Sequence, residues 1–459
     1  MKDRPTFASV ILNRGFRFLW LNQILVQLAY NTLNFTLIVW VFKLTESALA
    51  VSFLVMAMYL PAVLFGIFAG VFVDITDRRK VIIVIDFLLA LSFLLFILIK
   101  GSYSLILLNT FFINSLAQFF VPAEGSSIPM LVNKKQLIIA NSLFSLTLYG
   151  SFMIGFSLAG PLLNFFGINY VFYLAFGAMF LAFISAQFLP TIKVANIHAK
   201  YNNLLSFRNI RKIVNITFKE ATETWQFIRG NLAVAVAIGL LSAIQGIIGS
   251  LAVVMPSFME KVLRIHATDT SYFVMVPLGL GMVVGALIIG KWAHNKPRRS
   301  VVIPSIVAAG VIFILAGLIP SIAEILQASD LSSKIPHPRY FFRVPTLSAT
   351  YAIGAFLLGL VAVGIIIPSQ TVLQENTNTR NRGKIFAVLA VIMYAISAVP
   401  VLLAGLLADL IGPSAIFLGM GVVVFIAGVI ALRPNQFFRE RYLSDRIRAF
   451  LGLGHWQGE

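Results

Sequence analysis

Cysteine is absent from the 459 residues of this chain, and charged residues make up only 11% of it. Without cysteine, disulfides, thiolate metal sites and cysteine nucleophiles are excluded. The five histidines all fall in segments that we expect to be loops or the C-terminal tail, so we expect no histidine metal or catalytic cluster. The chain also lacks the GxxxxGK[ST] phosphate-binding sequence, which argues against ATP as its energy source.

Hydrophobic residues are what the chain has in abundance, at 59%, with a mean hydropathy of +0.92. A soluble domain carries about a quarter charged residues, so this composition predicts an all-α polytopic membrane protein. Twelve apolar segments are long enough to cross a bilayer. We place them near 18–42, 48–72, 80–99, 103–122, 137–160, 168–189, 232–258, 271–291, 301–320, 347–369, 385–408 and 413–432.

The net charge of +18 follows a topological pattern. With the N-terminus inside, the predicted cytoplasmic segments hold 28 of the 35 Lys and Arg residues and the outer loops hold 7. The positive-inside rule accounts for this bias, so no nucleic-acid partner is needed to explain the charge. We expect a multi-pass protein of the plasma or inner membrane with both termini cytoplasmic.

The spans group into two halves around a long basic link. We expect a cytoplasmic lead-in over 1–17, a six-helix bundle over 18–190 and a cytoplasmic linker over 191–231. A second six-helix bundle over 232–432 and a cytoplasmic tail over 433–459 complete the chain.

The two halves are parallel copies of one another. A shift of 220 residues aligns "GVFVDITDRRKV" at 70–81 with "GKWAHNKPRRSV" at 290–301. A shift of 245 aligns "LAGPLLNFFG" at 158–167 with "LAGLLADLIG" at 403–412. The difference between the shifts places an insertion in the outer loop at 321–346.

A weaker repeat lies inside each half. A glycine precedes a polar or ionisable residue by four positions at Gly70/Asp74, Gly160/Asn164, Gly290/His294 and Gly405/Asp409. These pairs end spans on opposite sides of the membrane, as an inverted three-plus-three repeat would give. Such glycines let a neighbouring helix approach closely.

These motifs resemble those of the major facilitator superfamily. The signature of that family between its second and third spans is roughly G-x3-D-[R/K]-x-G-R-[R/K]. Gly70, Asp74, Arg78 and Arg79 match it, whereas Ile75 and Asp77 depart from it. "VPAEGSSIPMLV" and "NRGKIFAV" look like the branch that contains bacterial macrolide-efflux and siderophore-export proteins.

The resemblance implies a secondary transporter that works by alternating access, with its substrate near the bilayer midplane. It also implies that Asp74 and Arg78 belong to a cytoplasmic gate. We assign to this gate motif the residues Gly70, Asp74, Arg78 and Arg79 and their repeats Gly290, Arg298 and Arg299.

Amide side chains are the candidates for the substrate cavity. The first span carries a stripe of four at helical spacing, Gln23, Gln27, Asn31 and Asn34. Amides are costly against lipid, so the stripe faces protein or a water-filled cavity. Either it forms interhelical hydrogen bonds or it lines the cavity. Asn114 and Gln118 in the fourth span and Gln245 in the seventh are further candidates.

Proton coupling needs an acid within the membrane. Asp86 in the third span and Glu124 in the fourth are the two candidates; alternatively, Asp86 pairs with a loop arginine and Glu124 caps the segment after Pro122. We expect no cofactor beyond an ion gradient, no enzymatic activity and a functional monomer. The expected function is proton-driven export of amphipathic small molecules; an importer, a facilitator or a lipid flippase is the alternative.

Overall fold

The computed structural model describes residues 6–191, 222–223, 225–292, 297–328, 344–376 and 382–432. Within these ranges the regular structure is helical, and twelve helices are long and apolar enough to cross a membrane. The predicted all-α fold with twelve spans is therefore confirmed. After the short α1 (Phe7–Ile11), the first six are α2 (Arg14–Thr45), α3 (Ala48–Asp74), α4 (Arg78–Ile99), α5 (Tyr103–Leu131), α6 (Leu137–Phe166) and α7 (Ile168–Gln187). The other six are α9 (Leu232–Lys261), α10 (Val276–Trp292), α11 (Arg299–Ala328), α13 (Val344–Asn376), α14 (Arg382–Ile411) and α15 (Pro413–Leu432).

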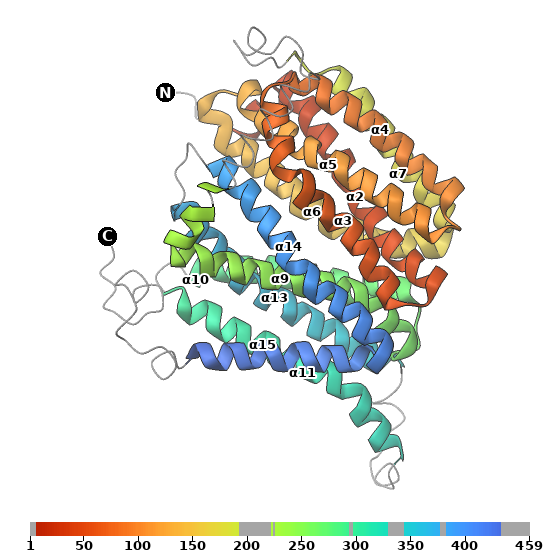
Figure 1. The fold of residues 1–459 in the computed structure, drawn as a ribbon. Coiled ribbons are helices and arrows are strands. Elements are labelled where there is room, and N and C mark those ends of the chain that lie inside the picture. Colours follow the sequence, from red (N-terminus) through yellow and green to blue (C-terminus); the bar gives the residue numbers. More distant parts are fainter. Residues whose placement is uncertain are drawn as a thin grey trace. The chain divides into compact units, whose positions relative to one another are not determined.

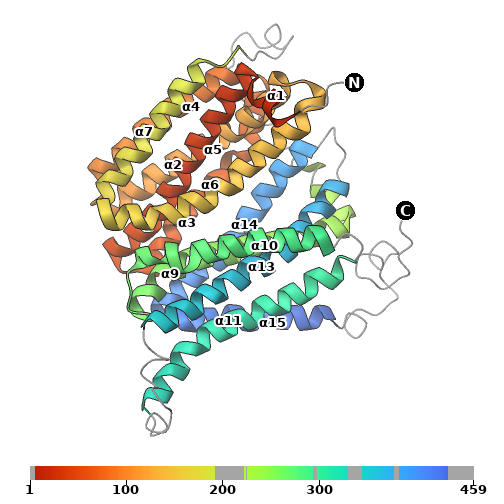
Figure 2. The ribbon, with the colours of Figure 1, turned by 180° about the vertical axis from the view of Figure 1, so that it is seen from behind.

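The described chain forms two compact units. The first comprises the described residues within 1–45, 53–225 and 383–395, and the second comprises those within 46–52, 226–382 and 396–459. In the first unit α2 packs against α6 and α7, and α4 packs against α5 and α7 (Figure 1). In the second unit α11 packs along α15, and α10 along α13 (Figure 2).

Aromatic residues form much of the packing inside each unit. The stacked rings of Phe96 in α4 and Phe172 in α7 lie 5.4 Å apart between their centroids, and both side chains are fully buried. In the second unit Phe258 of α9 lies edge-on to Phe417 of α15 at 4.7 Å. Each large aromatic side chain buries about 150–250 Å², so these contacts join helices that are distant in sequence.

The sequence repeat has a backbone counterpart at two glycines. Gly167 ends α6 with a φ of 76°, and Gly412 ends α14 with a φ of 89°. Each donates its N–H to the carbonyl four residues earlier, at Leu163 and Ala408, and both distances are 3.1 Å. Positive φ favours glycine because it has no Cβ. The two glycines and both carbonyls correspond at a shift of 245, so the repeat is present in the backbone conformation as well as in the amino-acid sequence.

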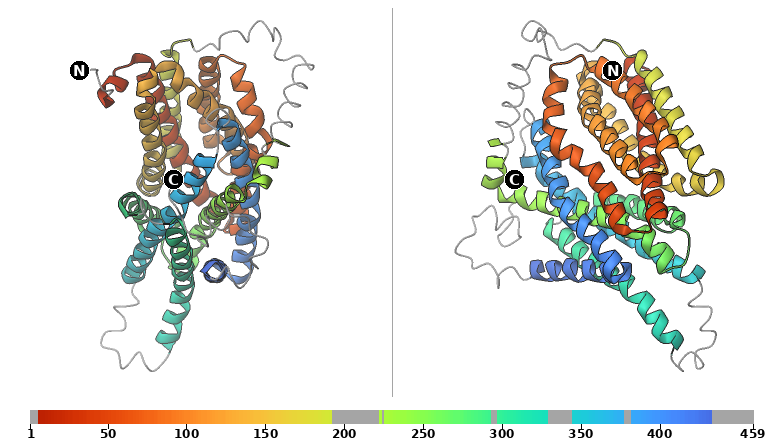
Figure 3. Two further views of the ribbon diagram at one scale, coloured as in Figure 1. Left: turned by 90° about the vertical axis from the view of Figure 1, so that its left-hand side faces the viewer. Right: turned by 45° about the vertical axis from the view of Figure 1, so that its right-hand side comes forward.

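The insertion differs from the expected loop over 321–346. Helix α11 continues to Ala328, and α13 begins at Val344, three residues inside the expected loop. Figure 3 shows the end of α11 extending past its neighbours in the second unit. The segment "SIAEILQA" contains neither glycine nor proline and is rich in helix formers, so the helix has no reason to end at residue 320. Residues 329–343 lie outside the described part of the chain.

Candidate functional site

Two amides of the stripe on α2 serve helix packing. Gln23 is 4% exposed, and its Nε2 donates to the carbonyl of Phe144 in α6 at 3.2 Å. Asn31 donates Nδ2 to the carbonyl of Gln27 at 2.8 Å. A Cβ built on Gly155 of α6 would lie only 2.8 Å from the Cβ of Asn31. Gln23 therefore forms an interhelical hydrogen bond, whereas the side-chain hydrogen bond of Asn31 stays within α2 and its Cβ packs closely against α6.

Asn34 takes part in a second group, which connects α2 to α5. The hydroxyl of Tyr30 donates to Oδ1 of Asn114, and the side chain of Asn34, one turn further along α2, lies near the same hydroxyl. Asn114 donates to the carbonyl of Thr110 at 2.8 Å, and Gln118 donates to the carbonyl of Asn114 at 3.3 Å. The structure thus brings together Asn34, Asn114 and Gln118, while Gln245 lies in α9 of the second unit.

Tyrosines flank this polar group within the first unit. Tyr394, in the part of α14 that belongs to this unit, lies near Tyr30. The rings of Tyr59 and Tyr394 lie 4.9 Å apart between centroids. All three tyrosines are partly exposed. Amide and phenol groups beside aromatic faces can contact an amphipathic molecule through both its polar and its apolar parts.

The predicted acid Asp86 lies fully buried among neutral groups. Asn22 of α2 is also fully buried, and its Nδ2 donates to Oδ2 of Asp86 at 2.7 Å and to the carbonyl of Ala182 at 2.9 Å. Within the described ranges, Oδ1 of Asp86 has no hydrogen-bond partner. The partner of Asp86 is therefore an amide, and no arginine of the described residues forms an ion pair with it.

Glu124 lies in the same unit as Asp86. Glu124 is 5% exposed, and its Oε1 has no hydrogen-bond partner among the described residues. The two carboxyl groups are close enough to interact electrostatically. Two ionised carboxylates in such a setting would be costly, because an unpaired charge out of water costs several kcal/mol.

The cationic cluster at 78–80 attaches the start of α4 to two other helices of the first unit. Arg78 donates Nη1 to the carbonyl of Ser126 at 2.9 Å, and Arg79 donates Nη2 to the carbonyl of Gln187 at 2.7 Å. Asp74 lies 4.0 Å from Arg78, and its side chain is 66% exposed. Exposed pairs contribute little, so the two carbonyls hold the cations more firmly than Asp74 does.

In the second half, two arginines at the start of α11 likewise bind to other helices. Arg298 donates Nη2 to both carboxylate oxygens of Glu375, at 2.6 and 2.5 Å. Arg299 donates to the carbonyls of Ala431 and Leu432, both at 3.1 Å. Arg79 and Arg299 each bind the C-terminal carbonyls of the last helix in their half. Positive charge is favourable there because it faces the negative end of the helix dipole.

The glycines of the gate motif are not sites of close approach in this structure. A Cβ on Gly70 or Gly290 would meet no described atom within 4 Å. Gly405 differs, since a Cβ there would lie 2.7 Å from the Cβ of Ser52. The close approach expected at Gly70 and Gly290 is therefore not found among the described residues, and His294 lies outside them.

Asp409, four residues after Gly405, caps the first turn of α3 inside the second unit. Its carboxylate accepts hydrogen bonds from the N–H groups of Ala48 and Leu49, at 2.9 and 3.0 Å. The hydroxyl of Ser47 donates to it at 2.6 Å. Free N–H groups at a helix start need such acceptors, so an acid from α14 supplies the cap of α3.

Sequence reasoning missed three of these residues. Asn22 lies one position before Gln23. The sequence could have indicated it through Asp86, because a buried acid needs a hydrogen-bond donor nearby. Asp77 replaces the usual glycine of the motif, and its side chain accepts from the N–H of Arg79 at 3.1 Å, which makes it the N-cap of α4. Glu375 carried no positional signal, because the residue at its repeat position in the first half is not an acid. Over the described ranges, no three His, Cys, Asp or Glu residues are grouped to hold a metal ion.

Comparison with known proteins identifies the family. The model described as Major Facilitator Superfamily matches residues 19–329. Macrolide efflux protein A of Streptococcus pyogenes is 22% identical over 439 residues, covering 92% of this chain and 96% of that protein. The multidrug efflux pump Tap of Mycolicibacterium fortuitum is 23% identical over 399 residues, covering 84% and 87%. Among solved structures, an auto-inhibited peptide transporter of the POT family is similar in fold alone, with a TM-score of 0.66, 12% identity and coverage of 95% and 100%. Because the family model spans well over half of its residues, the chain belongs to the Major Facilitator Superfamily.

Proposed function

We propose that this membrane transporter exports amphipathic small molecules, neutral or cationic, in exchange for protons. The efflux proteins among its relatives support export, although their identity to this chain is low. The group formed by Tyr30, Asn34, Asn114 and Gln118 supports an amphipathic substrate. Lys and Arg do not occur among the buried charged side chains of the described ranges, which disfavours an organic anion.

The observation that carries the proton coupling is the buried pair of Asp86 and Glu124. Neither carboxyl group has a cationic partner in the described part of the chain, and each has an unbonded oxygen. A proton removes the cost of burying one of these charges. We assign proton binding to this pair, with Asn22 as the group that orients Asp86.

The gate assignment rests on the motif at both repeats. Asp74, Arg78 and Arg79, with Gly70, would form the gate of the first half, and Gly290, Arg298 and Arg299 that of the second. A gate acts by stabilising one conformer more than the other, and the pair of Asp74 and Arg78 is weak enough to break during a cycle. An Asp74→Asn variant should insert normally and transport slowly.

The test is efflux from pump-deficient bacteria that express the chain, with a cationic dye and a macrolide as substrates. Efflux is measured with and without a protonophore. Asp86→Asn and Glu124→Gln should each abolish protonophore-sensitive efflux at normal expression. Ser92→Ala is the matched control, because Ser92 is buried in α4 and donates only to the carbonyl of Leu88.

The outcomes separate the parts of the proposal. Protonophore-sensitive efflux that Asp86→Asn abolishes supports both export and the coupling site. Full protonophore-sensitive efflux in Asp86→Asn removes that residue from the mechanism. Absence of efflux from well-inserted protein contradicts the export of drugs and favours a transporter of a narrower metabolite or lipid.

A further inference from the structure

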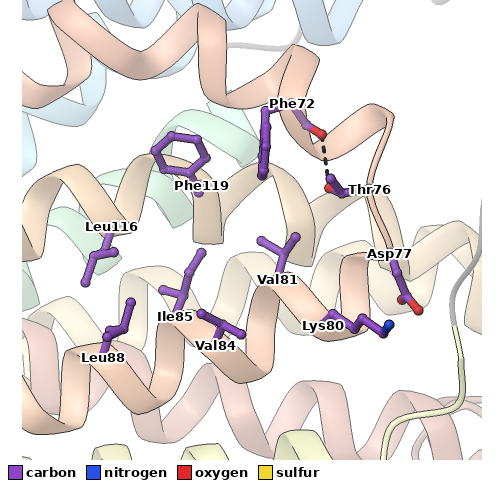
Figure 4. A pocket seen from close by; sticks show the side chains of 10 residues that line it. All are labelled: Phe72, Thr76, Asp77, Lys80, Val81, Val84, Ile85, Leu88, Leu116 and Phe119. Atoms are coloured by element: carbon purple, nitrogen blue, oxygen red, sulfur yellow. Dashed lines mark hydrogen bonds between the residues drawn. The ribbon is translucent and has the colours of Figure 1, made fainter. Parts of the chain in front are cut away.

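A groove of about 730 Å³ lies in the first unit between the end of α3, the start of α4 and α5 (Figure 4). Seven of its ten lining residues are apolar. They are Phe72, Val81, Val84, Ile85, Leu88, Leu116 and Phe119. Asp86 and Glu124 are not among the lining residues, so the groove is distinct from the proposed proton site.

The groove has a polar end, formed by Thr76, Asp77 and Lys80. Thr76 donates its hydroxyl to the carbonyl of Phe72 at 3.0 Å, as Figure 4 shows. Asp77 is 8% exposed and is used as the N-cap of α4. Lys80 is exposed and has no hydrogen-bond or ion-pair partner in the ranges that the structure describes. Lys80 is thus the polar group of the groove that is available to a ligand.

The two neighbouring cations, Arg78 and Arg79, are not among the residues that line the groove. The guanidinium groups of Arg78 and Arg79 are bound to the carbonyls of Ser126 and Gln187. Lys80 is therefore the one cation among the ten lining residues of the groove, beside a carboxylate that is engaged with the backbone of α4.

The length of the groove along α4 fits a lipid chain within one leaflet. Lys80 lies in the first turn of α4, at the end of a predicted membrane span, and Leu88 lies eight residues further along the same helix. At 1.5 Å per residue this separation is about 12 Å. One leaflet of a bilayer has a hydrocarbon thickness of about 15 Å, half of the total. A chain that starts at Lys80 and follows the apolar wall would remain within one leaflet.

We propose that this groove binds an anionic phospholipid, with its phosphate at Lys80 and one acyl chain against the apolar wall. Lipid is the medium outside the helices of a membrane protein, and Val84 of the wall is 55% exposed. The available Lys80 favours a negatively charged headgroup over a neutral one. The lipid belongs to the leaflet on the side of the loop between α3 and α4. This inference goes beyond the proposed transport function and does not depend on it.

Native mass spectrometry of the purified full-length chain tests the proposal. The protein is mixed with equal amounts of phosphatidylglycerol and phosphatidylcholine of identical acyl chains, and the first bound lipid is counted. We expect a preference of about fivefold for phosphatidylglycerol, the size of effect that one lysine near an anionic surface produces. Lys80→Gln should bring the ratio close to one, and Lys135→Gln, an exposed lysine of the loop between α5 and α6, should leave it unchanged.

A second pair of variants tests the apolar wall. Val84→Trp should fill the groove and reduce the first binding event of both lipids, whereas Leu91→Trp, 46% exposed on the same helix, should not. Val84→Phe serves the same purpose if the tryptophan variant expresses poorly. Equal binding of the two lipids by the unmodified protein, or a preference that survives Lys80→Gln, would overturn the proposal. Unchanged lipid binding in both Val84 variants would overturn it as well.

Discussion

The single amide group of Asn22 holds two helices in place at the buried acid. It donates to Asp86 in α4 and to the carbonyl of Ala182 in α7, and its own Oδ1 has no partner among the described residues. Asn22 therefore fixes where Asp86 lies, although it has no proton to exchange itself. A positioning residue of this kind is tested through stability as well as through transport.

Replacing Asn22 with alanine should destabilise the first unit by about 1–2 kcal/mol. The variant loses two buried hydrogen bonds and leaves Asp86 without a donor, and membrane-protein hydrogen bonds are worth up to about 1.7 kcal/mol each. Thermal unfolding of the purified protein in detergent measures the change. Gln27→Ala is the matched control, an amide of the same helix whose side chain lies in a partly exposed position. Equal melting temperatures for the two variants would contradict the role of Asn22.

Two glycines of α6 should respond in opposite ways to the same substitution. In Gly155→Ala the new methyl group would lie 2.8 Å from the Cβ of Asn31 and 3.1 Å from the backbone nitrogen of Thr32. Such overpacking costs about 1–3 kcal/mol. Gly150→Ala meets no atom within 4 Å and should be neutral or stabilising, since alanine has the higher helix propensity. The same unfolding assay compares them, and a stable Gly155→Ala would show that α2 and α6 can separate.

The first turns of two helices, α3 and α4, are capped by side chains at very different distances along the chain. Asp77 caps its own helix α4, whereas α3 combines a local cap, in which Ser47 accepts from the N–H of Ala50 at 3.1 Å, with Asp409, which lies more than 350 residues away. The first case is local and could be inferred from the sequence, because Asp is a preferred N-cap. The second could not, because nothing in the sequence near Ala48 indicates which acid supplies the cap.

Loss of the Asp409 carboxylate should loosen the first turn of α3. In Asp409→Ala, the N–H groups of Ala48 and Leu49 lose their acceptor, and loss of such a cap costs about 1 kcal/mol. Hydrogen–deuterium exchange of the peptide covering residues 46–52 should become several-fold faster. Glu46→Gln, which removes an exposed acid from the same segment, should leave the exchange unchanged. Unaltered exchange in Asp409→Ala would mean that water satisfies these groups equally well.

Composition predicted the elements well because the membrane imposes their length. Twelve apolar segments became twelve helices, since every backbone group in lipid must be satisfied inside its own helix. Helix ends were harder to place, as the extension of α11 to Ala328 illustrates. Only part of the candidate site could be predicted. The helical spacing that singles out Asn34, Asn114 and Gln118 is visible in the sequence. The packing role of Gln23 and Asn31 is not, because it depends on which face of α2 meets α6.

At the scale of the whole molecule, the absence of cysteine makes the predicted topology easy to test. A single cysteine placed at Ser206 lies in the linker that we expect to be cytoplasmic, and one at Ser332 lies in the predicted outer loop. A membrane-impermeant maleimide added to intact cells should label Ser332→Cys and should label Ser206→Cys only after the cells are opened. The unmodified chain has no cysteine to label and serves as the negative control. The reverse pattern of labelling would show that the chain has the opposite orientation in the membrane.

The bonds from Arg79 and Arg299 also bear on how the chain is made. Arg79 binds a carbonyl 108 residues further along, and Arg299 binds carbonyls 132 and 133 residues further along. During synthesis, each arginine can form its bond only after the sixth helix of its own half has been translated. Neither bond needs any residue from the other half. These two bonds can therefore form as the last helix of each half leaves the translocon, whereas the contacts of Ala48 and Leu49 with Asp409 must wait until the second half has been translated.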